Sequence, residues 1–381
     1  MREPTMIGAY GPWAASLLGE GPARLSFRQP GWVDLEAWRA VARARLEECL
    51  ASPPMPPVPQ AECLERTVYD GLEIEHLRWP WPYGSPTEAV FLKPAGASGP
   101  LPGILGLHDH AGLKYFGARK ITRTGERQHP MMEVHQKVYY GGVAWANEIA
   151  KRGYAVLVHD AFAFGSRRVL LADVPEAMRG GLDDSDPENP SRIAAYNQWA
   201  AQHESIMAKS LFCAGTTWPG VFLLEDRMAL NILCARPEVD ASRVGCAGLS
   251  GGGLRTVFLA GSDERIRCAV CVGMMTTWRD YLLYKAVNHT WMVYVPLLPR
   301  DLDYPEILGL RVPLPTLVLN NRQDSLFTLP EMERADRILA EVYAKAGASE
   351  RYRCTFYDGP HKFDLPMQAE AFAWFDQWLK A

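Results

Sequence analysis

The sequence predicts an α/β fold, a doubly wound and mostly parallel sheet of about eight strands with helices on both faces. Short apolar runs recur along the chain, and segments with helical periodicity separate them. Several of the runs break into polar or Gly-containing loops, as strands of an open sheet do at the edge that carries functional groups. With 381 residues, of which 48% are apolar, the chain is long enough to bury such a core and to carry insertions.

The first part of the chain, residues 1–60, is predicted to be an accessory segment. A helical pattern begins at Asp34 and places apolar residues such as Trp38 on one face, so this helix should pack against the main body. The Pro-rich stretch 53–59 is predicted to end the segment as a stiff linker. The remainder, residues 61–381, is predicted to be a single α/β domain with insertions.

The main domain is predicted to open with an antiparallel edge and to continue with alternating strands and helices. Residues 67–92 show strand-like alternation around a Trp- and Pro-rich turn. Six parallel strands are expected after it, at about residues 102–107, 155–159, 244–247, 268–272, 316–319 and 353–357, with helices such as 143–151, 221–234 and 330–346 between them.

Three long connections are predicted to be insertions that shape a pocket: residues 114–142, 165–217 and 276–310. The first is rich in lysine and arginine, which indicates either a solvated loop or a surface that meets an anionic group. The second is either a lid or an elaborated connection. The third carries many aromatic residues, and Trp278 and Trp291 are candidates to bind substrate, with ordinary packing as the alternative.

The most informative stretch is residues 243–253, where an apolar strand leads into a G-x-S-x-G turn and then a helix. This pattern predicts that Ser250 occupies a nucleophile elbow, a sharp turn between strand and helix that exposes the hydroxyl. Gly248 and Gly252 would let neighbouring backbones pass closely at this turn. The alternative is that Ser250 merely caps the N-terminus of the helix.

An acid and a histidine follow Ser250 in the order that elbow chemistry requires, each just after a short apolar run. Asp324 is the predicted acid and His361 the predicted base. A neutral His361 imidazole can take the Ser250 proton, while Asp324 fixes its tautomer and stabilises the imidazolium. Asp280 is a competing acid, Asp324 could only cap the next helix, and His361 could be an ordinary loop histidine.

Backbone N–H groups are expected to stabilise the negative charge that develops during attack by such a serine. Gly251 supplies one, because it directly follows the nucleophile. The second should come from residues 101–112, where an apolar strand ends in a loop that contains histidine and glycine. The His110 N–H is predicted for this role, with Asp109 or Ala111 as alternatives.

The side chains of His108 and Asp109 in the same loop are candidates to contact the substrate. The His108-x-His110 spacing would place both rings on one side of an extended segment, which is also typical of metal ligands. No further ligand cluster stands at a recognisable spacing, and a serine mechanism needs no metal. Neither a metal nor a cofactor is therefore predicted.

With these motifs, the chain resembles the α/β-hydrolase superfamily, and within it the dienelactone hydrolase and acetyl xylan esterase-like branch. Residues 108–117, the elbow at 248–252 and residues 358–363 carry the resemblance, which covers most of the chain from Thr67 onward. Two features depart from the family pattern. Dienelactone hydrolases use a cysteine where this elbow has a serine, and Ala111 stands where the loop commonly has a glycine.

The resemblance implies a serine carboxylic-ester hydrolase that acts through an acyl-enzyme on short, acetyl-type esters. The expected partner is a small-molecule ester. A carbohydrate acetyl esterase or a lactone hydrolase is a variant of this prediction, and a serine peptidase of the same superfamily is an alternative. A binding protein without activity would usually lack one of the three catalytic residues.

Composition and charge exclude several other classes. The formal net charge of −4 provides no basic surface for nucleic acid, and no apolar run has the length of a membrane span. The N-terminus shows no secretory signal pattern, which predicts a cytoplasmic enzyme, although a mature secreted form is the alternative. Six of the eight cysteines fall in predicted strands or helices and are expected to be core residues: Cys49, Cys234, Cys246, Cys268, Cys271 and Cys354.

Overall fold

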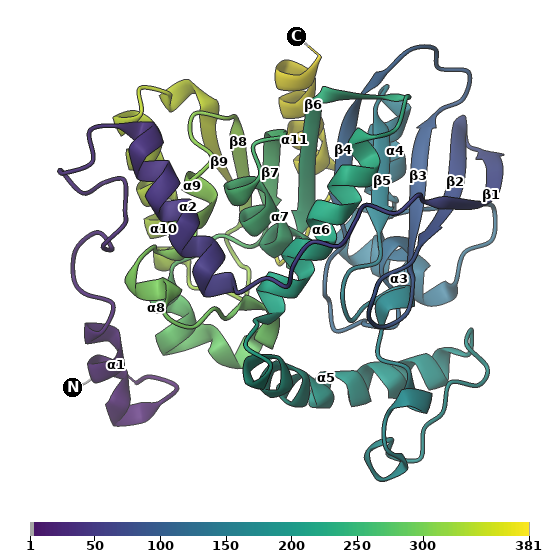
Figure 1. The fold of residues 1–381 in the computed structure, drawn as a ribbon, viewed down its shortest axis with the longest axis horizontal. Helices are drawn as coiled ribbons and strands as arrows, with labels where there is room; N and C mark the ends of the chain where they lie inside the picture. Colours follow the sequence, from purple (N-terminus) through teal and green to yellow (C-terminus); the bar gives the residue numbers. More distant parts are fainter. Residues whose placement is uncertain (1–3, 381) are drawn as a thin grey trace.

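The computed structural model describes residues 4–380, so residues 1–3 and 381, which fall within the two predicted segments, lie outside it. A single nine-stranded sheet runs through the molecule in the order β1-β2-β3-β5-β4-β6-β7-β8-β9 (Figure 1). The strands are β1 (Glu62–Tyr69), β2 (Leu72–Trp79), β3 (Thr87–Pro94), β4 (Leu101–Leu107), β5 (Ala155–His159), β6 (Val239–Leu249), β7 (Ile266–Val272), β8 (Thr316–Asn321) and β9 (Tyr352–Tyr357).

The sheet has nine strands where about eight are predicted, and the additional strand lies in the antiparallel edge, which contains β1, β2 and β3. Strands β1 and β2 pair directly up to Tyr69 and Leu72, which leaves only Asp70 and Gly71 in the connecting turn. Both turn residues have positive φ, 50° and 76°, as tight hairpins with a right-handed twist require. Most of β1 is exposed and not apolar, so its first half gave no periodic signal and the prediction began too late.

The six predicted parallel strands are all present. Strands β4 to β9 pair in parallel with their neighbours, and β3 joins this part of the sheet by antiparallel pairing with β5. Because parallel strands point the same way, their carboxyl ends meet along one edge of the sheet, where open α/β folds place their sites.

Helices cover both faces of the sheet, and each face has its own apolar core. The N-terminal helix α2 begins after Asp34, whose carboxylate accepts the N–H groups of Glu36 and Ala37, and its Trp38 is completely buried. This helix therefore packs against the main body as predicted. One face carries α2 (Leu35–Leu50), α6 (Trp218–Cys234), α7 (Gly251–Ser262), α9 (Tyr304–Gly309) and α10 (Leu329–Lys345), and the other carries α4 (Trp145–Lys151) and α11 (Leu365–Leu379).

The three predicted insertions supply the remaining helices. Helix α3 (Pro130–Tyr139) lies in the first, and α5 (Pro190–Cys213) in the second, where it runs along the lower edge of the molecule in Figure 1. The third contains α8 (Trp278–Asp280) and several single turns, and α1 (Gly11–Ser16) precedes the main body. None of the helices within residues 4–380 combines the length and the apolarity needed to cross a bilayer.

Candidate active site

Ser250 stands between β6 and α7 in a backbone conformation that few non-glycine residues adopt, with φ 56° and ψ −118°. Such strain is typical of a nucleophile elbow. The Ser250 side chain makes no capping hydrogen bond to α7, so the capping alternative is wrong. A Cβ at Gly248 or Gly252 would collide with the Leu107 carbonyl oxygen, which explains why both positions around the serine are glycine.

His361 and Asp324 form a hydrogen-bonded pair at the same edge of the sheet. His361 follows β9 and Asp324 follows β8, and the distance from His361 Nδ1 to Asp324 Oδ2 is 2.6 Å. The second oxygen of Asp324 accepts the Leu326 N–H at 2.9 Å, so the buried carboxylate is held at both ends. The His361 Nδ1 then carries the proton, and Nε2 is left as the acceptor.

Asp280, the competing acid, is engaged elsewhere. Its carboxylate accepts the hydroxyl groups of Thr276 and Thr328, both at 2.8 Å, and the Thr328 N–H at 3.0 Å. Burial raises the pKa of this carboxyl. Asp280 therefore ties the third insertion to the start of α10 and does not contact His361.

A cavity of about 370 Å³ contains both Ser250 and His361. The Nε2 atom of His361 is buried and has no hydrogen-bond partner within residues 4–380, so it is free to accept a proton. The cavity wall combines apolar side chains with polar groups from several elements. Besides these two residues, the wall includes His110, Gly251, Tyr139, Ala201, Glu204, Leu254, Met274, Val287, Asn288, His289, Thr290 and Leu326.

The two predicted oxyanion donors lie together beside Ser250. A Cβ placed on Gly251 would be 2.9 Å from the backbone nitrogen of His110, so the loop after β4 approaches the start of α7 closely. Neither the Gly251 nor the His110 N–H has an acceptor in the part of the chain that the structure describes. Two unpaired donors next to a nucleophile are what an oxyanion hole requires.

Asp109 lines the cavity and His108 does not, but both side chains are buried and bonded within the protein. His108 is buried, with Nδ1 3.0 Å from the Asp109 carbonyl oxygen, and its Nε2 accepts the Ala161 N–H. The Asp109 carboxylate accepts Tyr140 Oη–H at 2.5 Å and lies 3.0 Å from His135 Nε2. Burial would raise the pKa of Asp109, but His135, Lys120 and these hydrogen bonds together lower it.

The His110 ring is fixed by an acidic residue that the sequence did not indicate. Gly112 N–H donates to Nδ1 at 2.9 Å, so Nε2 carries the hydrogen that it donates to Glu204 of α5 at 2.9 Å. The same carboxylate lies 2.5 Å from Lys114 Nζ. Burial alone would raise the pKa of Glu204, but the His110 hydrogen bond and the Lys114 charge outweigh it and lower the pKa. Helix α5 thus forms one wall of the cavity and holds the loop that carries His110.

The third insertion lines the cavity, but not through the two predicted tryptophans. Trp278 is buried, donates its indole N–H to Leu302 O at 3.0 Å and packs against Tyr304. The Trp291 ring is partly exposed and does not line the cavity, although its backbone N–H donates to Glu204. Residues 287–290 reach the cavity instead, among them His289, whose pKa is lowered to about 4 by burial.

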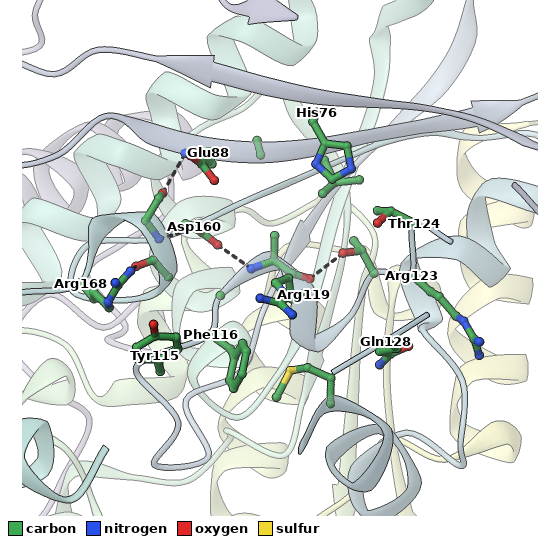
Figure 2. A pocket seen from close by; sticks show the side chains of 18 of the residues that line it. His76, Glu88, Tyr115, Phe116, Arg119, Arg123, Thr124, Gln128, Asp160 and Arg168 are labelled. Carbon is green, nitrogen blue, oxygen red and sulfur yellow. Dashed lines mark hydrogen bonds between the residues drawn. The ribbon is translucent and has the colours of Figure 1, made fainter. Parts of the chain in front are cut away.

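A second, larger cavity of about 510 Å³ lies beside the first insertion (Figure 2). Three of its four arginines are engaged by the protein: Arg119 pairs with Glu188 at 2.8 Å, Arg123 donates to backbone carbonyls, and Arg168 lies over the Tyr115 ring. The fourth, Arg127, is exposed at the cavity wall. The lysines of the same insertion, Lys114 and Lys120, are buried away from it. Internal contacts thus account for Lys114, Lys120, Arg119 and Arg123 of residues 114–142, while Arg127 stays exposed at the cavity.

The sequence matches no family model. A protein of Bacillus subtilis (strain 168) named as a hydrolase, YtaP, is 26% identical over 294 residues, which cover 76% of this chain and 83% of that protein. A solved Bacteroides fragilis NCTC 9343 protein described as an acetyl xylan esterase superposes with a TM-score of 0.68 at 17% identity, covering 92% of this chain and 83% of that one.

A glucuronoyl esterase from Solibacter usitatus superposes with a TM-score of 0.63 at 16% identity, covering 94% of this chain and 98% of that one. At such identities the superpositions establish the fold. The chain therefore has the α/β-hydrolase fold, as its nine-stranded sheet, the strained serine after β6 and the superpositions indicate.

Proposed function

We propose that the protein is a serine carboxylic-ester hydrolase with the triad Ser250, Asp324 and His361. The observation that carries the proposal is the shared cavity of a strained serine and a histidine whose Nε2 is unpaired while its Nδ1 is bound to a carboxylate. The names of the similar proteins, a hydrolase and two esterases, support the same reaction class.

In the proposed reaction, Ser250 Oγ attacks the ester carbonyl carbon as His361 Nε2 takes the hydroxyl proton. The carbonyl oxygen becomes negative and accepts the N–H groups of Gly251 and His110. Collapse of the tetrahedral intermediate expels the alcohol, which receives the proton from His361 and leaves an acyl-enzyme. Water, activated by the same histidine, then releases the carboxylic acid and regenerates Ser250.

The proposed substrates are esters of short, acetyl-type acids. A cavity of about 370 Å³ with Leu254, Met274 and Leu326 in its wall suits a small apolar acyl group. The esterase names of the solved neighbours favour carbohydrate esters as a second class. No metal or cofactor takes part in the proposal. All eight cysteines are unpaired, which is typical of the reducing cytoplasm, where we place the enzyme.

The test is hydrolysis of nitrophenyl esters from acetate to laurate, and of acetylated sugars, by the native protein and by Ser250→Ala. We expect turnover that is highest for short acyl groups and at least about a thousandfold loss of kcat in the variant. Ser262→Ala, at the far end of α7, is the matched control and should keep native activity. Native turnover by Ser250→Ala would remove Ser250 from the mechanism.

A further inference from the structure

The Lys120 ammonium is completely buried beneath the loop that carries His110. Its Nζ donates to two consecutive backbone carbonyls, Asp109 O at 2.7 Å and His110 O at 2.9 Å. Removing a cation from water is costly unless it is paired and hydrogen-bonded, so a buried ammonium on main-chain oxygens requires a structural or a functional reason. These two oxygens lie on either side of the proposed oxyanion donor.

Peptide geometry connects Lys120 with the oxyanion hole. The Asp109 carbonyl and the His110 N–H belong to one trans peptide unit, in which the two groups point in opposite directions. A cation on the carbonyl therefore directs the N–H away from Lys120. On that opposite side lies Gly251, where an added Cβ would be 2.9 Å from the His110 nitrogen.

The same contact also strengthens the donor. A hydrogen bond from a charged group polarises the amide, and polarised amides donate more strongly through the N–H. The Asp109 oxygen receives a second donor as well, since His108 Nδ1 lies 3.0 Å from it. The His110 N–H has no acceptor within residues 4–380, so this polarisation is available to a bound substrate.

Lys120 is itself held in place by the turn in which it lies, Ala118–Lys120. Asp160 accepts the Ala118 N–H at 2.7 Å, and Thr122 donates its hydroxyl to Ala118 O at 2.9 Å; Figure 2 shows Asp160 at the wall of the second cavity. The ammonium lies 3.8 Å from the Asp109 carboxylate and 4.8 Å from the centre of the Phe164 ring. The cation is therefore fixed before any substrate binds.

We propose that Lys120 is a positioning residue of the oxyanion hole, which aims and polarises the His110 N–H through the Asp109 carbonyl. This inference rests on the proposed function. Lys120 contacts no reacting atom, so its effect belongs to the transition state, in which the carbonyl oxygen becomes negative, and not to substrate binding.

The electrostatic surroundings of Lys120 make this effect dependent on pH. Burial lowers the pKa of Lys120 to about 8, assisted by the positive charges of Lys114 and Arg255 and opposed by Asp109 and Asp160. As pH rises through that value, the ammonium loses its charge and polarises the peptide less. Oxyanion stabilisation should therefore weaken in alkaline solution.

The experiment compares a nitrophenyl ester with the matching thionoester, in which sulfur replaces the carbonyl oxygen. Sulfur is a weak hydrogen-bond acceptor, so the ratio of kcat/KM for the two substrates reports the oxyanion contacts. In Lys120→Met we expect kcat for the ester to fall about 10- to 100-fold with KM little changed, and the ester preference to fall by a similar factor. If Lys120 had a purely structural role, kcat/KM would fall by the same factor for both substrates.

Lys345→Met is the control, because Lys345 also donates to two carbonyls, Phe27 O and Gln29 O, but lies outside the cavity. It should leave the ratio unchanged. Lys120→Arg keeps a cation and should retain part of the preference. If neither Lys120 variant folds, the test is the pH dependence of the native protein. Its ratio of kcat/KM for the ester to kcat/KM for the thionoester should fall as the pH rises from 7 to 10.

An unchanged ester preference in folded Lys120→Met, or in the native protein across that pH range, would overturn the inference. The proposed function fails separately, through full activity of Ser250→Ala. Loss of activity in Ser250→Ala together with an unchanged ratio in Lys120→Met would therefore reject only the role of Lys120.

Discussion

The two sides of Ser250 are built differently. On the histidine side, the groups proposed to act are the side chains of His361 and Asp324, which lie in the loops after β9 and β8. On the loop side, the proposed groups are backbone N–H donors. Buried charged side chains elsewhere in the chain, such as Lys120 and Glu204, hold the loop that carries one of them.

This difference decides what a substitution does. A substitution on the histidine side removes either a reacting group, His361, or the carboxylate that binds it, Asp324. Activity should then be lost while the fold remains. Removing a supporting charge on the loop side leaves every reacting group in place. There we expect smaller losses of activity, and larger losses of stability because a buried charge is left unpaired.

The largest effect is expected for Asp324→Asn. The amide has nearly the shape of the carboxylate, but it cannot stabilise an imidazolium and favours the wrong tautomer of His361. We expect kcat to fall about 10³- to 10⁴-fold, measured with the best ester at saturating concentration.

Asp280→Asn is the matched control, because Asp280 is also a buried aspartate of the same edge. It should cost roughly 1 to 3 kcal/mol of unfolding free energy through weakened hydrogen bonds to Thr276 and Thr328, with turnover per folded molecule preserved. Comparable losses of kcat in the two variants would mean that Asp324 is not the acid of the triad.

A smaller effect, on the loop side, is expected for Gly251→Ala. The new Cβ would meet the His110 nitrogen at 2.9 Å and the His110 Cβ at 3.0 Å, so the loop must move away from the serine. We expect kcat to fall about 100-fold, the effect of losing one oxyanion donor. Alanine suits the first turn of a helix, so the protein should still fold.

Gly309→Ala in α9 is the control for Gly251→Ala, because its added Cβ would find only ordinary contacts, the nearest at 3.5 Å. Thermal unfolding and kcat should both stay near the native values in that variant. If Gly251→Ala also kept the native kcat, the His110 N–H could not be the second oxyanion donor.

Sequence-based prediction worked best for the strands of the sheet and for the segments next to them. The fold class and the six parallel strands are confirmed. They could be predicted because each strand is a short apolar run bounded by polar or Gly-containing turns. The structure also brings Ser250 and His361 into one cavity and pairs His361 with Asp324, although their catalytic roles stay a prediction.

The remaining features had no local signal. Glu204 lies 94 residues from His110, and nothing in a 24-residue helix with a weakly apolar face marks that position. The sequence places Lys114 and Lys120 in a basic loop, and their burial depends on partners that are distant in sequence. Trp278 carries a large aromatic side chain into the core, as aromatic residues most often do.

The smallest effect on activity is expected for Glu204→Gln, whose main effect should be on stability. Glu204 accepts the His110 ring N–H and the Trp291 N–H, and its charge balances the buried Lys114 ammonium. The amide leaves that ammonium without a counter-charge, so we expect the unfolding free energy in urea to fall by about 3 kcal/mol. Since Lys120 still holds the His110 backbone, kcat should fall less than about tenfold.

The double variant Glu204→Gln/Lys114→Met distinguishes an ion pair from two independent contacts. Removing both charges leaves no unpaired buried ion, so the double variant should lose clearly less unfolding free energy than the sum of the single variants. Additive losses would show that Glu204 and Lys114 do not act as a pair. If kcat fell as much in Glu204→Gln as in Gly251→Ala, the ring of His110, and not only its backbone, would position the oxyanion hole. A side chain would then be essential on the loop side too, and the two sides of Ser250 would differ less.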